Sequence, residues 1–157
     1  SMVYVGFGIG GPLFGCLASK TGRAFLWMQM GLLLSCLALV MIIYITAWSE
    51  VWLIVWMVLF GLGTGAFMLG FWVGKEFNSL ILAGSILAMI NTGDAIFGAI
   101  SEPSIGGLLD MFSTQNTWGG TPIFFAVDYQ MAFFILPVYL LVASCLLICL
   151  GFFGSRS

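Results

Sequence analysis

Charge is the scarcest property of this 157-residue sequence, which contains only four Lys or Arg, six Asp or Glu, and no histidine. An ordinary soluble domain has about 25% charged residues because water must wet its surface, whereas here the charged fraction is 6%. So few charges cannot cover a water-exposed surface of the usual kind, and lipid must surround most of the chain. The clustered Lys and Arg of a nucleic-acid-binding surface are also missing, which excludes nucleic acid as a partner.

Metal-binding side chains are nearly as scarce. The four cysteines all lie within apolar runs: Cys16, Cys36, Cys145 and Cys149. Cys145 and Cys149 share a helix face at a spacing of four residues, but two thiols without histidine make a poor metal site. We therefore expect no metal, no cofactor and no disulfide framework, and we interpret the cysteines as small apolar side chains.

Hydrophobic side chains, by contrast, make up 62% of the sequence. A helix needs about 20 residues to cross the hydrocarbon layer, and only helices satisfy every backbone group within one segment there. A transmembrane barrel would need alternating strands, which a run such as residues 32–34 contradicts. Polar breaks predict five helices, at residues 2–18, 25–47, 51–73, 80–109 and 131–153. The predicted fold is an all-α, polytopic transmembrane bundle that forms a single domain over residues 1–157.

The basic residues predict how this bundle sits in the membrane. With five helices, the four bases fall on one side: Lys20, Arg23, Lys75 and Arg156. The long loop at residues 110–130, on the other side, has neither Lys nor Arg. Lys and Arg accumulate in cytoplasmic loops. We therefore expect an integral, multi-pass protein of the cell or inner membrane, with its N-terminus outside and its C-terminus in the cytoplasm.

Glycine is abundant, with 21 residues, and it recurs at helical spacing. Pairs four residues apart are Gly6–Gly10, Gly11–Gly15, Gly61–Gly65 and Gly70–Gly74. Small residues at this spacing allow helix backbones to approach closely, which replaces the hydrophobic driving force that lipid cannot supply. The pattern predicts tightly packed helices.

The fourth predicted helix has a face of small and polar residues. Within one arc of about 100° lie Ala83, Gly84, Asn91, Asp94, Gly98, Ser101 and Glu102, interrupted by Leu80, Leu87 and Ile105. Asp94 lies about 21 Å along the helix from Leu80, inside the hydrocarbon, whereas Glu102 lies about 33 Å along, near the outer boundary. A carboxylate at the bilayer centre costs about 2.5–3.5 kcal/mol. Asp94 should therefore face a partner or a wet cavity, or be protonated.

Asp94, Asn91 and Glu102 are accordingly the candidates for a substrate or proton pathway. Helix packing by a hydrogen-bonded acid is the alternative for Asp94. Three further polar residues fall at membrane depth as weaker candidates: Gln29, Ser35 and Thr64. Hydroxyl groups at such positions usually bond to the preceding helical turn.

The stretch from residue 15 to residue 23 resembles the cytoplasmic-loop signature of the major facilitator superfamily, G-x-L-a-D-r-x-G-r-r. Ser19 stands where the family usually has aspartate, and the motif residues kept here are Gly15, Leu17, Ala18, Lys20, Gly22 and Arg23. The family's antiporter motif, G-x-x-x-G-P-x-x-G-G, is echoed by Gly98, Pro103, Gly106 and Gly107. These features resemble helices eight to twelve, in the C-terminal half of that fold.

The resemblance implies a secondary active transporter that carries a small solute, driven by a proton or sodium gradient or by the solute's own gradient. In that family substrate binds between two halves that rock against each other. The chain would then be a fragment, and its partners would be the remaining half of the transporter, the solute and the lipid bilayer.

Two other functions remain open. A small membrane subunit could pack against a partner and transport nothing. An intramembrane aspartyl protease would need paired carboxylates, and residues 92–94 superficially resemble that family's G-x-G-D. Its second intramembrane aspartate is missing, because Asp110 and Asp128 are predicted at the outer face. We therefore expect no enzyme activity.

Overall fold

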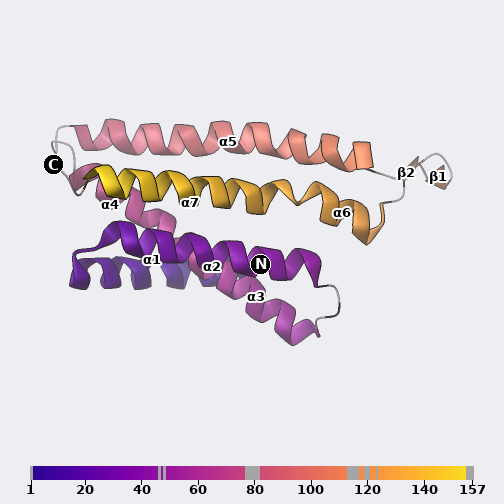
Figure 1. Cartoon of the computed structure of the whole chain (residues 1–157), viewed down its shortest axis with the longest axis horizontal. Helices are drawn as coiled ribbons and strands as arrows, with labels where there is room; N and C mark the ends of the chain where they lie inside the picture. The colour runs from indigo at the N-terminus through magenta and orange to yellow at the C-terminus, as the bar shows by residue number, and fades with distance from the viewer. Residues whose placement is uncertain are drawn as a thin grey trace.

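The computed structural model describes residues 2–45, 47, 49–76, 82–112, 117–118, 121–122 and 124–154. Apart from the connectors, the described residues are helical except for a ribbon of two short strands in the long loop, where β1 (Thr117–Trp118) pairs antiparallel with β2 (Thr121–Pro122). Five long helical passes run back and forth along one axis (Figure 1). The predicted five-helix bundle is confirmed at this level.

The first two passes are the helices α1 (Met2–Thr21) and α2 (Ala24–Tyr44). The first helix was predicted to end at residue 18, and this was wrong by about one turn. Gly22 has a φ of 65°, a conformation that glycine adopts without strain. Its N–H donates to the Ala18 carbonyl at 2.8 Å, which closes the helix. Lys20 therefore belongs to the last turn of α1, and the connector shrinks to two residues.

The third pass is bent, although a single helix was predicted at 51–73. It consists of α3 (Glu50–Thr64), the 3₁₀ turn η1 (Gly65–Phe67) and α4 (Met68–Glu76). The bend falls after a run of alternating glycines, where the Gly65 N–H lies close to the carbonyls of Gly61, Leu62 and Gly63. Glycine gives the backbone little intrinsic preference for the α-helix, so a tighter turn is tolerated there.

The last pass is also divided, into α6 (Ala126–Ala132) and α7 (Ile135–Gly154). It begins before the predicted residue 131. Pro137 explains the break, because it has no N–H to donate to the Phe133 carbonyl and its ring clashes with that group. Instead the Leu136 N–H donates to Phe133 at 3.0 Å.

Four helical stretches are long and apolar enough to cross a membrane: Met2–Thr21, Ala24–Tyr44, Glu50–Gly74 and Ala126–Gly151. These stretches are compatible with an integral membrane protein. The fourth pass, α5 (Ala83–Phe112), is longer than any of them but is not in this set. Its glycines and polar residues, including the Asn91–Asp94 segment, lower its mean hydropathy.

Glycine contacts hold the first three passes together. A methyl group added at Gly6, Gly10 or Gly61 would overlap the backbone of the facing helix, with α1 and α3 in mutual contact. On the α2 side of α3, a methyl group at Gly63 would lie 2.5 Å from Ser35 Oγ. Two of the predicted glycine pairs, Gly6–Gly10 and Gly61–Gly65, therefore do mediate close packing. A small core lies beside them, formed by Phe14, Ala18, Ala24, Ala66 and Leu69.

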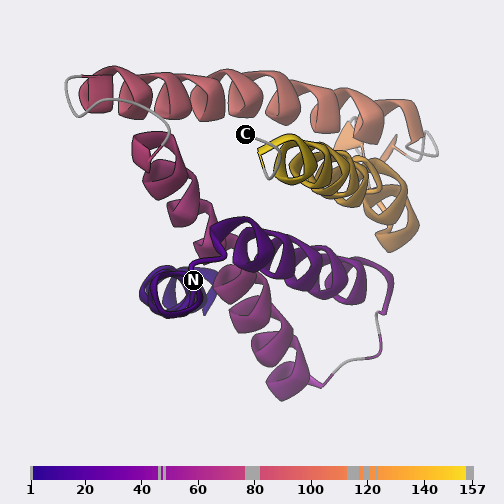
Figure 2. The same ribbon diagram turned by 60° about the vertical axis from the view of Figure 1, so that its left-hand side comes forward.

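The helix α5 packs much more loosely. Both views show α7 between α5 and the group formed by α1, α2 and α3 (Figures 1 and 2). Added methyl groups would meet nothing within 4 Å at Gly84, Gly93, Gly98, Gly106 and Gly107. Ring contact between Phe97 and Tyr139, 5.2 Å apart, joins α5 to α7. Met89, Ile96 and Ile100 remain exposed on α5, as expected of a face directed at lipid.

Candidate solute cavity

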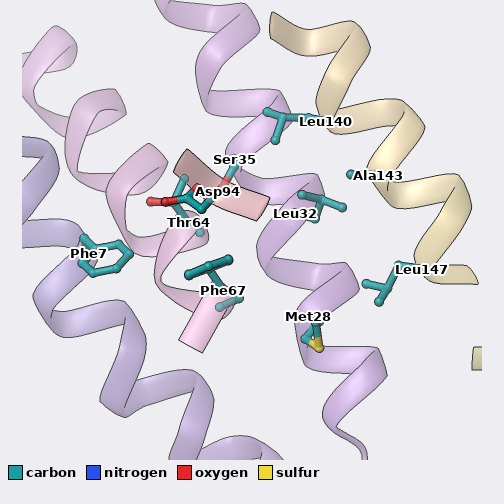
Figure 3. A pocket seen from close by; sticks show the side chains of 12 residues that line it. Phe7, Met28, Leu32, Ser35, Thr64, Phe67, Asp94, Leu140, Ala143 and Leu147 are labelled. Carbon is teal, nitrogen blue, oxygen red and sulfur yellow. The ribbon is translucent and has the colours of Figure 1, made fainter. Parts of the chain in front are cut away.

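A cavity of about 590 Å³ lies where all five passes meet. Its lining comes from α1, from α2, from the bend between α3 and α4, from α5 and from α7 (Figure 3). The lining residues are Phe7, Met28, Leu32, Ser35, Gly63, Thr64, Ala66, Phe67, Asp94, Leu140, Ala143 and Leu147. The size is that of cavities which enclose drug-sized ligands, about 300–1,000 Å³.

Asp94 supplies the only ionisable side chain of this lining. Its carboxylate makes no hydrogen bond or ion pair with any residue in the described part of the chain. The described basic side chains do not line the cavity: Lys20 belongs to the last turn of α1, and Arg23 precedes α2. The acid of the cavity lining therefore has no basic partner among the described side chains.

Two hydroxyl groups share the cavity with Asp94. Ser35 is 1% exposed and donates to the Gly31 carbonyl at 3.0 Å. Thr64 donates to the Gly61 carbonyl at 2.8 Å. Both bonds are the backbone bonds expected of hydroxyls within helices. Because each hydroxyl proton is used in this way, the oxygen lone pairs are what each group can offer to a ligand.

Beyond these three residues the wall is hydrophobic. Leu32 and Met28 come from α2, and Leu140 and Leu147 come from the facing side of α7. Phe7 and Phe67 contribute two aromatic rings (Figure 3). Sequence reasoning did not identify these residues as cavity-lining, since an apolar side chain in an apolar helix carries no sign of whether it faces lipid, a neighbour or a void.

Polar contacts fix α7 against α2 behind this wall. The Gln29 amide nitrogen donates to the hydroxyl of Ser144, which is 6% exposed. The Gln29 Oε1 atom is buried and has no partner among the described residues. Further along, Gln130 Nε2 donates to the Ile43 carbonyl at 3.0 Å, between α6 and α2. Gln29, a weak candidate from the sequence, thus links two helices and does not line the cavity.

The three predicted pathway residues occupy different places. All three side chains are exposed, but only Asp94 is part of the cavity lining. Asn91 lies almost one turn before Asp94, and Glu102 lies about two turns beyond it on the same helix α5. The structure therefore brings Asp94 together with Ser35 and Thr64. It does not bring Asp94 together with Asn91 and Glu102.

The loop-motif residues lie at the end of α1 and the start of α2. Gly22 closes α1, and Arg23 precedes the first turn of α2. Thr21 donates to the Leu17 carbonyl at 2.7 Å and accepts a hydrogen bond from Trp27 Nε1 at 2.8 Å. Gly15 has open space around it. The motif thus includes a tight two-residue connector, and none of its residues lines the cavity.

Protein-family models, curated proteins and solved structures were compared with the chain, and none of the three comparisons gives a match. The resemblance to the major facilitator superfamily therefore stays a prediction from the motifs.

Proposed function

We propose that the chain is the membrane-embedded part of a secondary transporter and that a small solute passes through the cavity at Asp94. Four apolar helices of membrane-spanning length support the location, and the cavity supports the solute. The resemblance of the loop motif to that of the major facilitator superfamily supports the assignment to the secondary transporters. In this proposal Lys20 and Arg23 face the cytoplasm, and the remaining half of the transporter covers the open side of α5.

The observation that supports the proposal most strongly is the carboxylate of Asp94, which has no described partner, in a mostly apolar cavity. A charge at this depth is costly and is retained in membrane proteins chiefly where it serves a pathway or a partner. Packing within the chain does not account for it, because Asp94 bonds to no described residue. A solute or a proton that neutralises Asp94 during transport does account for it.

Uptake measurements test the proposal. Cells that produce the intact gene product are offered a mixture of labelled small solutes, and accumulation is compared with that of cells without it. The proposal expects accumulation of at least one solute and its loss in Asp94→Asn at unchanged protein level. Asp110→Asn is the matched control, because Asp110 is an exposed acid at the end of the same helix and lies outside the cavity. Equal uptake by Asp94→Asn and the native protein would reject the role of Asp94.

A non-transporting subunit is the second candidate, and the loose packing of α5 favours it. Asn91 and Glu102 of this helix are exposed, and methyl groups added at five of its glycines would meet nothing within 4 Å, so a partner helix could pack against α5. Absence of uptake for every solute, together with co-purification of a stoichiometric partner, would favour this candidate. The protease alternative gains no support, because Asp94 is the only acid in the cavity lining.

A further inference from the structure

The polar groups of the cavity share one chemical property, which is that they accept hydrogen bonds. The Asp94 carboxylate accepts only, when ionised. Ser35 and Thr64 have committed their protons to the Gly31 and Gly61 carbonyls. The backbone N–H groups of the lining belong to helices and are used within them. A ligand that forms hydrogen bonds with Asp94, Ser35 and Thr64 must therefore supply the donor groups.

The charge of the cavity points in the same direction. Asp94 is the acidic residue of the lining, and no described Lys or Arg lines the cavity. An anionic ligand would place a second negative charge beside Asp94 in a medium of low polarity, where like charges repel strongly. A cationic ligand would instead neutralise it.

The remaining wall is apolar and includes the rings of Phe7 and Phe67. Aromatic faces attract cations, and the aliphatic side chains of α2 and α7 favour a hydrophobic body. We propose that the cavity binds a hydrophobic organic ammonium ion, with its N–H groups directed at Asp94, Ser35 and Thr64 and its apolar body against α2 and α7. This inference rests on the proposed function, because it names the solute class of the same cavity.

Three probes with one carbon skeleton test it: 3,3-diphenylpropylammonium, 3,3-diphenylpropan-1-ol and 3,3-diphenylpropanoate. The chain is placed in zwitterionic lipid nanodiscs, binding is measured by equilibrium dialysis, and empty nanodiscs correct for partition into lipid. The ammonium probe is expected to bind saturably at one site and at least tenfold more tightly than the alcohol, with the carboxylate weakest. Equal binding of the three, or preference for the carboxylate, would overturn the inference.

Variants locate the site. In Asp94→Asn, binding of the ammonium probe is expected to fall by roughly ten- to a hundredfold, the loss typical of a hydrogen bond to a charged group. Asp110→Asn should bind like the native chain. Ala143→Phe, which fills the cavity from α7, should abolish saturable binding of the ammonium and the alcohol alike. Native-like ammonium binding by both Asp94→Asn and Ala143→Phe would place the site elsewhere and refute the inference.

The outcomes separate this inference from the proposed function. Asp94-dependent uptake of an anionic or neutral solute, without ammonium binding, would leave the transporter proposal standing and reject the ammonium site. Saturable ammonium binding at Asp94 without uptake of any solute, ammonium probes included, would support the site and reject transport.

Discussion

Gly10 in α1 and Gly65 at the bend of the third pass are in backbone contact. A methyl group added at Gly65 would lie 2.8 Å from the Gly10 Cα atom and 2.6 Å from the Gly11 nitrogen. Neither backbone can move away easily, because α1 and α3 also meet at Gly6 and Gly61. The residues next to this contact, Thr64 and Ala66, line the cavity. One wall of the cavity is thus built on a rigid glycine interface.

Replacing Gly65 by alanine should therefore loosen this wall. We expect Gly65→Ala to destabilise the protein by about 1–3 kcal/mol, as overpacking usually does, and to lower its midpoint of thermal unfolding in detergent or nanodiscs. Gly8→Ala is the control, because Gly8 lies on α1, the helix that Gly65 contacts, with nothing within 4 Å of an added methyl group. The control should be neutral or slightly stabilising, since alanine favours the helix. Equal effects of the two substitutions would contradict the glycine interface.

The bond between Gln29 and Ser144 gives a prediction about helix association. Removing one partner leaves a buried polar group unpaired, so Gln29→Leu and Ser144→Ala should each destabilise the protein by about 1–3 kcal/mol. The double variant should cost clearly less than the sum of the two single variants, because both polar groups are then gone. Thermal unfolding of the native protein, the two single variants and the double variant gives the double-mutant cycle that measures this interaction. Strict additivity would show that the two side chains do not interact.

The topology can be tested with introduced cysteines in a chain whose native cysteines are replaced. Ser19 is exposed near the end of α1, and Thr117 belongs to the ribbon of the long loop. With the N-terminus outside, a membrane-impermeant maleimide should label Thr117→Cys in intact cells. It should label Ser19→Cys only after the membrane is permeabilised. Labelling of both cysteines in intact cells would rule out the proposed orientation and the odd number of membrane crossings between them.

The helices could be predicted from the sequence because their cause is local. Polar breaks between long apolar runs mark five passes, and all five are present. Two errors also had local signals: Pro137 could have predicted the break before α7, and Gly22 could have predicted the end of α1. The bend at Gly65 is harder to predict, because alternating glycines permit a 3₁₀ turn without requiring it.

The cavity could be predicted only in part. Asp94 was identified because a carboxylate at membrane depth is energetically costly and is retained chiefly where it serves a pathway or a partner. Ser35 and Thr64 were ranked low, since hydroxyls satisfy themselves on their own helix; they do so here and still line the cavity. The apolar wall from α2 and α7, and the distance of Asn91 and Glu102 from it, depend on how separate helices pack. Periodicity within one helix does not contain that information.

The account depends on lipid being the solvent of these helices, and alkaline extraction measures this directly. Membranes from cells that produce the protein are washed with sodium carbonate at high pH and centrifuged, and the chain is quantified in pellet and supernatant. Our account predicts that it stays in the pellet and is released only by detergent. Recovery of a folded, monodisperse chain from the carbonate supernatant would contradict it.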